Sequence, residues 1–330
     1  MTSRTILIVD DDDDLRSTLV EQLSLYEEFR VLQESTASKG VHTARGGLID
    51  LLIMDVGLPD MDGREAVKLL RKGGFKSPII MLTGQDTDSD TILGLEAGAI
   101  PPLVVMPHGG PEMRDTLTFD GHAQLLASHG YAVFQPNFRG STNRDDAFKL
   151  AGYGEWGRKM QTDISDGLAA LADAGIVDPQ RACIVGASYG GYAALAGVTL
   201  QQGLYRCAVA VAPVSDIRAM YNEDYRESGD RRITKEALLQ QLGPRDRWDD
   251  VSPRRNADRA DAPILLIHGR EDTVVPYSHS TQMADKLKDN GKPYELVSLD
   301  GEDHWLSLSA TRQQMLEATM RFVQEHNPAD

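Results

Sequence analysis

The sequence is poor in cysteine, and it has no long apolar run. Its only cysteines are Cys183 and Cys207, and each lies in an apolar, strand-like run, where a buried free thiol is expected rather than a disulfide or a metal ligand. Near the N-terminus a short apolar run ends at the aspartates of residues 10–14, which fits neither a signal peptide nor a membrane helix. We therefore expect a cytoplasmic protein without a membrane partner.

Basic residues are also scarce relative to acidic ones. The chain has 34 lysines and arginines against 50 aspartates and glutamates, a net charge of −16. This balance disfavours nucleic-acid binding, which depends on clustered basic side chains. A hydrophobic content of 41% over 330 residues is enough for ordinary cores and suggests two globular domains.

Short β-branched runs alternate with helical patterns throughout, which is typical of parallel α/β architecture. Strands are predicted at residues 5–9, 30–33, 51–54 and 79–82, and then at 103–106, 132–136, 182–185, 208–211, 264–267 and 295–298. Only a short, proline-containing connection, residues 99–102, separates the two sets. We predict one domain over residues 1–99 and a second over residues 100–330.

Acidic side chains follow the strands of the first domain. Asp10 and Asp11 follow the first strand, Asp55 the third, and Thr83 the fourth. Ligands of parallel sheets bind beyond the carboxyl ends of strands, so these side chains should converge. Close carboxylates repel one another unless a hard cation lies among them, and oxygen ligands suit Mg²⁺. The alternative is that they are solvated loop-end aspartates, while residues 12–14 are better explained as acids at a helix N-terminus.

This pattern strongly resembles the receiver domain of bacterial response regulators over about residues 4–99, which implies a flavodoxin-like fold and a histidine kinase as partner. The resemblance makes Asp55 the phospho-acceptor and Thr83 the phosphate-sensing residue. It also implies that Asp10, Asp11 and Asp55 hold Mg²⁺ together with the Gly57 carbonyl.

The resemblance stops at about residue 99. A receiver continues into a fifth strand that carries a lysine, and then into a fifth helix, whereas here the chain reads IPPLVVMP. No lysine occurs between Lys76 and Lys149. We therefore expect an incomplete receiver with weak or absent signalling output.

The second domain contains a nucleophile motif. Ser188 lies in Gly-Ala-Ser-Tyr-Gly after a predicted strand and before a helical run. Gly186 and Gly190 permit a sharp strand-to-helix turn that exposes the serine oxygen. Asp272 and His304 follow later strands, in the order that an α/β-hydrolase requires. Serine needs a histidine to accept its proton, and the histidine needs a carboxylate to orient it.

A glycine-rich turn supplies the remaining element. His108, Gly109, Gly110 and Pro111 follow the strand at 103–106, so the N–H groups of Gly109 and Gly110 can face an oxyanion, with the N–H of Tyr189 as the second donor. His108 is expected to stabilise the turn rather than act in catalysis, and His268, on a buried strand, is expected to be a core residue.

The second domain resembles the catalytic domain of the prolyl oligopeptidase family of serine peptidases over about residues 102–326, through HGGP, NFRGS, GEWG, DPQR, GASYGGY, VAPVSD, HGREDTVVP and GEDHW. The resemblance implies cofactor-free cleavage of peptides or small acyl esters. It makes Val214, Ile217 and Met220 candidates for a substrate pocket, together with the Tyr189 ring, although the three could equally be ordinary core.

Two departures from this family matter. Its members carry an N-terminal β-propeller, whereas residues 1–99 here read as βα units, so exopeptidase specificity is not implied. The strands that normally precede HGGP are missing as well, so the hydrolase sheet should begin inside its usual order, with an exposed edge. The strand at 103–106 could complete either sheet, and we assign it to the hydrolase because it would be buried there beside the serine strand.

Two functions compete for a chain that resembles a chimera of two truncated domains. The first is a serine hydrolase with a receiver-like module of doubtful competence. The second is a phosphorelay protein whose hydrolase part is an output or docking body. The complete Ser188, Asp272 and His304 set favours the first.

Overall fold

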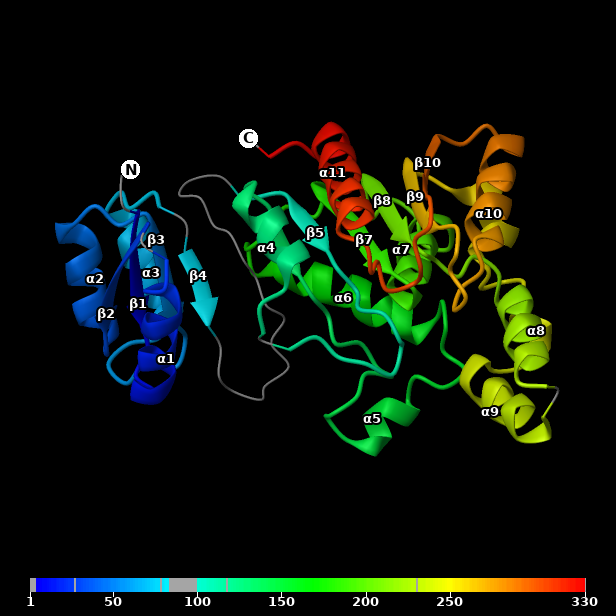
Figure 1. The fold of residues 1–330 in the computed structure, drawn as a ribbon, viewed down its shortest axis with the longest axis horizontal. Helices are drawn as coiled ribbons and strands as arrows, with labels where there is room; N and C mark the ends of the chain where they lie inside the picture. The colour runs from blue at the N-terminus through cyan, green and yellow to red at the C-terminus, as the bar shows by residue number, and fades with distance from the viewer. Residues whose placement is uncertain are drawn as a thin grey trace. The chain divides into compact units, whose positions relative to one another are not determined.

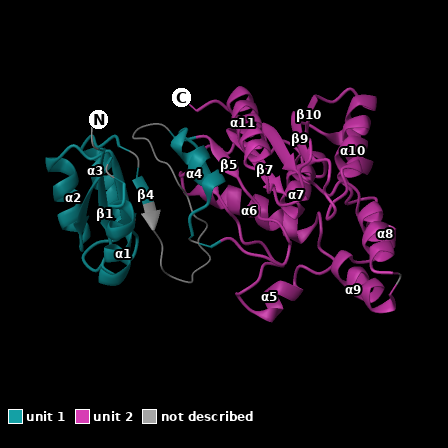
Figure 2. Ribbon diagram, in the orientation of Figure 1, with its two compact units in different colours: residues 1–101, 116–133 teal, residues 102–115, 134–330 magenta. Residues whose placement is uncertain are grey.

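The computed structural model describes residues 4–26, 28–77, 79–82, 100–116, 118–229 and 231–329 (Figure 1). Contacts within the chain divide it into two compact units, residues 1–101 with 116–133 and residues 102–115 with 134–330 (Figure 2). The predicted boundary at residues 99 and 100 adjoins residues outside the described ones and stays a prediction.

The first unit contains a parallel sheet with the strand order β2-β1-β3-β4. Its elements are β1 (Arg4–Val9), α1 (Asp13–Leu23), β2 (Phe29–Glu34), α2 (Ala37–Gly46), β3 (Leu51–Asp55), α3 (Gly63–Lys72) and β4 (Ile79–Leu82). The four strands predicted here are confirmed, with ends that differ by at most one residue.

Helices cover both faces of this sheet, because alternate side chains of a strand point to opposite faces. Leu7 and Val9 of β1 belong to a cluster with apolar residues of α2 and α3. Ile6 and Ile8 belong to a second cluster, with Leu19 and other residues of α1. The apolar run of β1 is therefore buried on both sides, as in doubly wound α/β folds.

The second sheet has six strands in the order β10-β9-β8-β7-β5-β6. Its strands are β5 (Leu103–Val105), β6 (Ala132–Phe134), β7 (Ala182–Ala187), β8 (Cys207–Val211), β9 (Ile264–Gly269) and β10 (Tyr294–Leu299). All six predicted strands are confirmed, with ends that differ by up to two residues. Strand β5 pairs in parallel with β7, β7 with β8, β8 with β9, and β9 with β10.

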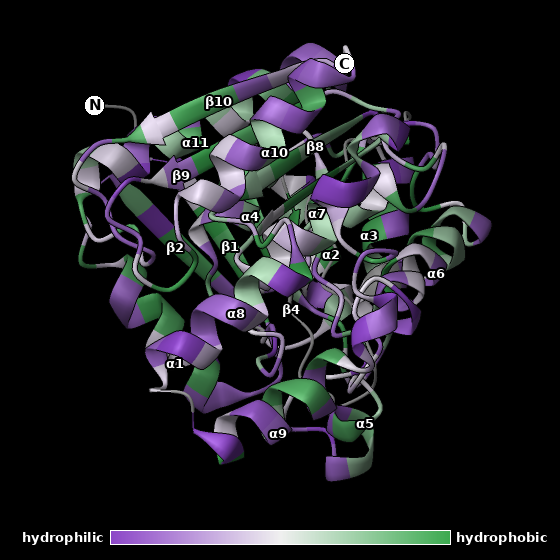
Figure 3. Ribbon diagram, turned by 90° about the vertical axis from the view of Figure 1, so that its right-hand side faces the viewer, coloured by the Kyte–Doolittle hydropathy of each residue, from purple (hydrophilic) through white to green (hydrophobic). Residues whose placement is uncertain are grey.

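Helices and short 3₁₀ segments connect these strands. They are α4 (Gly121–Ser128), α5 (Asp146–Leu150), α6 (Lys159–Asp173), α7 (Tyr189–Thr199), α8 (Ile217–Glu227), α9 (Arg232–Leu242), η1 (Arg245–Arg247), η2 (Pro253–Arg259), α10 (Ser278–Asp289) and α11 (Ser309–His326). Helix α7 packs on β7 and β8, and α11 packs on β8, β9 and β10. Hydrophilic and hydrophobic residues alternate along α8 and α9 (Figure 3), as expected of helices with one solvent-facing side.

The strand predicted at residues 103–106, which could have completed either sheet, belongs to the six-stranded sheet. Leu103 pairs with Ala182 of β7, and Met106 donates its N–H to the Phe134 carbonyl at 2.7 Å. The three residues of β5 are fully buried, as in central strands of parallel sheets. In the described residues the four-stranded sheet ends at β4 and the six-stranded sheet ends at β6.

The prediction of free thiols is wrong, because Cys183 and Cys207 form a disulfide. The two residues are register partners on the adjacent strands β7 and β8, and their Cα atoms are 4.8 Å apart. Strand pairing between segments 24 residues apart in sequence brings the side chains together, and the local pattern around each cysteine does not contain that information.

No helix in the described parts of the chain is long and apolar enough to cross a membrane.

Candidate active site

Ser188 lies at the turn between β7 and α7. Its backbone is in the left-handed region, with φ 57° and ψ −118°, a conformation that non-glycine residues rarely adopt without a functional reason. Its N–H donates to the Val211 carbonyl of β8 at 2.9 Å. The side chain is partly exposed and lies at the N-terminus of α7, where negative charge is favoured.

Two glycines allow this turn. A Cβ at Gly186 would lie 2.3 Å from the Gly190 carbonyl oxygen, and one at Gly190 would lie 2.1 Å from the Pro107 carbonyl oxygen. Both contacts are too short for any side chain. The absence of side chains at these glycines lets the glycine-rich turn after β5 approach Ser188 closely. A Cβ at Gly109 would be 3.5 Å from the Cβ of Ser188.

Asp272 and His304 form the second half of the triad. Asp272 follows β9 and His304 follows β10, and these strands are neighbours in the sheet. The Nδ1 atom of His304 lies 2.7 Å from Oδ2 of Asp272, so the carboxylate fixes the imidazole with Nε2 free to serve as the base. This is the pairing that the sequence predicts.

The Asp272 carboxylate is buried and surrounded by donors. Its Oδ1 accepts the N–H groups of Val274 and Val275, each at 2.8 Å. Burial alone would raise the pKa of this carboxyl, but hydrogen bonds from His268, His304 and Val275 outweigh it and hold the pKa well below its ordinary value. Asp272 is therefore ionised whenever His304 works as a base.

The predicted oxyanion donors flank Ser188. Tyr189 begins α7, so its N–H has no acceptor within the helix. The ring of His108 stacks on Phe138 and donates from Nδ1 to the Gly109 carbonyl at 2.7 Å. Because C=O and N–H point in opposite directions across a trans peptide, this bond also sets the direction of the Gly110 N–H. Burial lowers the pKa of His108 to about 4, so it supports the turn as a neutral ring.

The Tyr189 ring does not line a pocket. It is 1% exposed and packs against Phe138, Trp156 and Tyr192, with ring centroids 5.2, 4.5 and 5.6 Å away. The ring is directed into the core by the first turn of α7, and only the backbone of Tyr189 remains available to a substrate.

The three predicted pocket residues differ in exposure. Val214 and Ile217 are 3% and 0% exposed, whereas Met220 is partly exposed. Ile217 and Met220 belong to α8, so the position of that helix decides what a substrate meets. Of the three, Met220 is the side chain with surface to offer.

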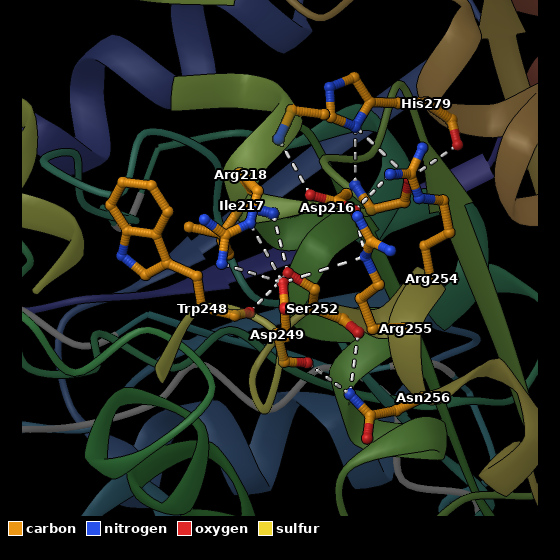
Figure 4. A network of polar contacts seen from close by, with 12 residues as sticks. Asp216, Ile217, Arg218, Trp248, Asp249, Ser252, Arg254, Arg255, Asn256 and His279 are labelled. Carbon is orange, nitrogen blue, oxygen red and sulfur yellow. Dashed lines mark hydrogen bonds and ion pairs between the residues drawn. The ribbon is translucent and has the colours of Figure 1, made fainter. Parts of the chain in front are cut away.

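A buried polar network fixes the start of α8 (Figure 4). Asp216, fully buried, caps the helix by accepting the Ala219 N–H at 2.9 Å and forms ion pairs with Arg254 and Arg255. Ser252 accepts the Ile217 N–H at 3.0 Å. Burial alone would raise the pKa of Asp216, but the Ala219 N–H and the two arginines lower it, so the cap is a carboxylate at neutral pH.

The family model of the prolyl oligopeptidase family matches residues 117–328, a range that is more than half of the chain and includes Ser188, Asp272 and His304. The chain belongs to the prolyl oligopeptidase family. The predicted catalytic residues Ser188, Asp272 and His304 follow the carboxyl ends of β7, β9 and β10.

Several known proteins are similar to this chain. Dipeptidyl aminopeptidase BIII of Pseudoxanthomonas mexicana is 32% identical over 212 residues, which are 63% of this chain and 31% of that protein. Dipeptidyl peptidase family member 6 of Caenorhabditis elegans is 31% identical over 64% of this chain and 29% of its own length. A puromycin-hydrolyzing peptidase of Mycobacterium tuberculosis superposes with a TM-score of 0.67 at 29% identity, covering 73% of this chain and 37% of that one.

The chain thus spans about a third of the length of the curated relatives it matches.

The predicted acidic pocket lies in the first unit. Asp55 is the last residue of β3, and Asp10 directly follows β1, the neighbouring strand. Both are buried, at 7% and 3% exposure. Burial raises the pKa of each carboxyl, and the charge of Asp10 raises that of Asp55 further. Asp11 is exposed.

Backbone groups support this pocket. Gly57 donates its N–H to Oδ2 of Asp55 at 2.8 Å, and Asp12 donates its N–H to Oδ1 of Asp10 at 2.8 Å. Asp12 also caps α1, and Asp13 and Asp14 lie in its first turn, which confirms the helix N-terminus interpretation for these three residues. Thr83 lies outside the described residues.

A response regulator receiver domain model matches residues 6–104, so the chain contains a receiver domain ahead of its prolyl oligopeptidase domain. Two buried carboxyls with raised pKa values, one of them raised further by the charge of the other, fit a cation between them. No set of three or more histidine, cysteine or acidic side chains is arranged for a metal ion in the described part of the chain. A cation here would therefore depend on few carboxylates and otherwise on backbone oxygen and water.

Two residues at the hydrolase site were not predicted to act there. His268, expected to be core, is fully buried but also contacts Asp272, with Nε2 3.2 Å from Oδ2. Trp305 is 76% exposed and stands edge-on to the His304 ring. The sequence signal for His268 was the HGRED motif, which places it four residues before Asp272. The signal for Trp305 was the GEDHW motif, in which it directly follows His304.

Proposed function

We propose that this prolyl oligopeptidase-family chain is a serine hydrolase that cleaves peptide or acyl-ester bonds through an acyl-enzyme at Ser188. The observation that carries the proposal is the 2.7 Å contact between His304 and Asp272, at the same edge of the sheet as a serine held in a left-handed turn. This arrangement has a cost in backbone strain, and such strain is concentrated at functional sites.

The reaction uses the groups already described. Nε2 of His304 accepts the Ser188 proton as the serine oxygen attacks the carbonyl carbon. The N–H groups of Tyr189 and of Gly109 or Gly110 stabilise the oxyanion, each such donor being worth about 10²–10³ in rate. His304 then passes the proton to the departing amine or alcohol. Water, activated by the same histidine, releases the acid and restores Ser188.

The substrate class follows from the relatives and from the exposed side chains. Dipeptidyl aminopeptidases and a puromycin-hydrolyzing peptidase both act on amide bonds, so a peptide or amide is the natural substrate of this site. Trp305 stands beside the histidine that protonates the leaving group, and its exposed indole offers apolar surface on that side. A cytoplasmic location stays a prediction.

A fluorophosphonate probe tests this proposal. The probe should label wild-type protein at one position, Ser188, as shown by peptide mass spectrometry, and Ser188→Ala should not be labelled. His304→Gln, which keeps the serine, should be labelled much more slowly because the base is gone. Equal labelling of all three proteins, or none of the folded wild type, would contradict the assignment.

We further propose that Asp55 accepts a phosphoryl group. Its buried carboxylate lies beside that of Asp10, and the receiver match supports this role. Asp10, Asp11 and Asp55, with the Gly57 carbonyl, would hold Mg²⁺, which would neutralise charge on the entering phosphoryl group. A histidine kinase is the corresponding partner. Since the lysine of the fifth strand is absent, we expect slow or negligible phosphorylation.

A further inference from the structure

His268 lies on β9 in the interior of the hydrolase, and its ring nitrogens are both in use. Nδ1 is 2.7 Å from the Ser280 hydroxyl of α10. Nε2 is 2.8 Å from the Val275 carbonyl and 3.2 Å from Oδ2 of Asp272. A carbonyl and a carboxylate can only accept, so Nε2 carries a proton and donates to both.

The contact places two histidines on one oxygen atom. Oδ2 of Asp272 receives the Nδ1–H of His304 at 2.7 Å and the Nε2–H of His268 at 3.2 Å. The other oxygen, Oδ1, is occupied by the N–H groups of Val274 and Val275. The carboxylate plane is therefore set by four donors, only one of which moves protons during catalysis.

The surroundings of His268 leave it little freedom. The ring is fully buried, and Tyr277 stands edge-on to it with ring centroids 5.7 Å apart. Its register partner on β10 is Ser298, which bonds to the Tyr277 hydroxyl. Asp303, which precedes His304 in the chain, interacts with Asp272 through charge alone. Within the described structure, Asp272 is the acid that His268 contacts.

We propose that His268 is a positioning residue that sets both the orientation of Asp272 and the basicity of His304. This inference rests on the proposed function, because it concerns the same triad. By donating to Oδ2, His268 withdraws part of the negative charge that would otherwise stabilise protonated His304. It also holds the oxygen at the place where His304 meets it.

Removing the donor should have two effects. Without the His268 donor, Oδ2 of Asp272 keeps more of its negative charge, and this charge stabilises protonated His304. The acidic limb of the kcat/KM profile should therefore move to higher pH. A hydrogen bond to a charged group is strong enough for a shift of roughly half a pH unit or more. The loosened carboxylate should lower kcat by about tenfold, because small displacements at a reacting centre are costly.

The test compares His268→Asn, His268→Gln and Ser280→Ala. An asparagine amide replaces the Nδ1 side of the ring and lacks the Nε2 donor, whereas a glutamine amide reaches the Nε2 position. Ser280→Ala disturbs the same buried site from the opposite nitrogen and leaves the Asp272 contact in place. The rates of fluorophosphonate labelling and of turnover are measured as a function of pH. Each rate is divided by the amount of protein that the probe labels, so that unfolded protein does not contribute to the comparison.

We expect a shifted acidic limb in H268N, a limb close to wild type in H268Q, and an unshifted limb in S280A. If H268N does not fold, His268→Leu, a second variant without the Nε2 donor, takes its place: an acidic limb shifted to higher pH supports the proposal, and a limb that coincides with those of H268Q and S280A overturns it. An unshifted limb in folded H268N also overturns it. A wild-type protein that is not labelled at any pH contradicts the proposed function, and this inference then fails with it, whereas a labelled wild type with an unshifted H268N contradicts only this inference.

Discussion

Asp224, in the last turns of α8, has a pKa well above that of an ordinary aspartate. Burial, together with the charges of Glu227 and Glu223, raises its pKa to about 6, although His279 acts in the opposite direction. The ordinary pKa of an aspartate is 3.8, so between pH 3.8 and pH 6 the folded protein holds a proton that the unfolded chain has released. Folding is therefore favoured at the acidic end of this window and weakened as pH rises through 6.

Asp224→Asn should remove that penalty. Above pH 6 the variant should be more stable than wild type by about 1 kcal/mol, a value reduced from the full shift because the carboxyl is partly exposed. Below about pH 4 the difference should vanish, since both forms are then neutral. Urea unfolding at pH 4 and pH 7.5 measures this.

The matched control is Asp246→Asn, which removes the same charge from an exposed position and should give a small, pH-independent change. If the stability difference between Asp224→Asn and wild type were the same at both pH values, the proton held by Asp224 would not be the cause.

At the scale of elements, the disulfide joins β7, which ends at the nucleophile, to β8. Both cysteines are fully buried, and they close a loop of 24 residues. Dithiothreitol should therefore leave the bond intact in the folded protein and reduce it in urea. Protein unfolded and refolded under reducing conditions should be less stable by about 3 kcal/mol, because the unfolded chain is no longer constrained.

Alkylation with iodoacetamide followed by mass spectrometry measures the state of the two thiols, and urea curves measure stability. Alkylation of both cysteines in protein that never met a reductant would show that the bond does not form. A Ser188→Ala sample handled in parallel controls for changes at the nearby nucleophile.

The elements themselves could be predicted because each strand carries its own pattern. Apolar β-branched runs such as those of β1 and β9 mark strands wherever they occur, and the order of Ser188, Asp272 and His304 after successive strands gives the triad. Pairs that form only across strands could not be predicted. Cys183 with Cys207, and His268 with Asp272 and Ser280, depend on register and on side-chain direction.

The orientation of the Tyr189 ring was unpredictable for a related reason. The motif specifies a backbone turn at Ser188, but whether the next ring points to the substrate or into the core depends on Phe138 and Trp156, which come from distant segments. Helix-facing apolar residues such as Val214 and Ile217 likewise have the same pattern whether they line a pocket or fill the core.

At the scale of the whole molecule, one strand matches two families. The receiver match reaches residue 104 and so includes the first residues of β5, which pair with β7 of the hydrolase sheet. A strand cannot fill both places. The hydrolase sheet keeps it because β5 is central there, between β6 and β7, and carries the oxyanion turn at its end. In the described residues, the receiver sheet is accordingly left with four strands.

This loss leads us to expect that the two activities are uncoupled. Coupling requires an element with two arrangements that both sites bias, and it is typically worth about 1–3 kcal/mol. By resemblance, that element in a receiver is the face after Thr83, with a lysine on the fifth strand that pairs with the phosphoryl group. The chain has no lysine between Lys76 and Lys149, so a phosphoryl group on Asp55 has no such partner.

Beryllofluoride with Mg²⁺, or acetyl phosphate, should therefore change kcat/KM for an ester substrate by less than about threefold, below the usual range of coupling. Modification of Asp55 is followed by mass spectrometry in the same samples, with Asp55→Asn as the control. A larger change that tracks modification of Asp55 and is absent in Asp55→Asn would show that another basic or backbone group has replaced the missing lysine.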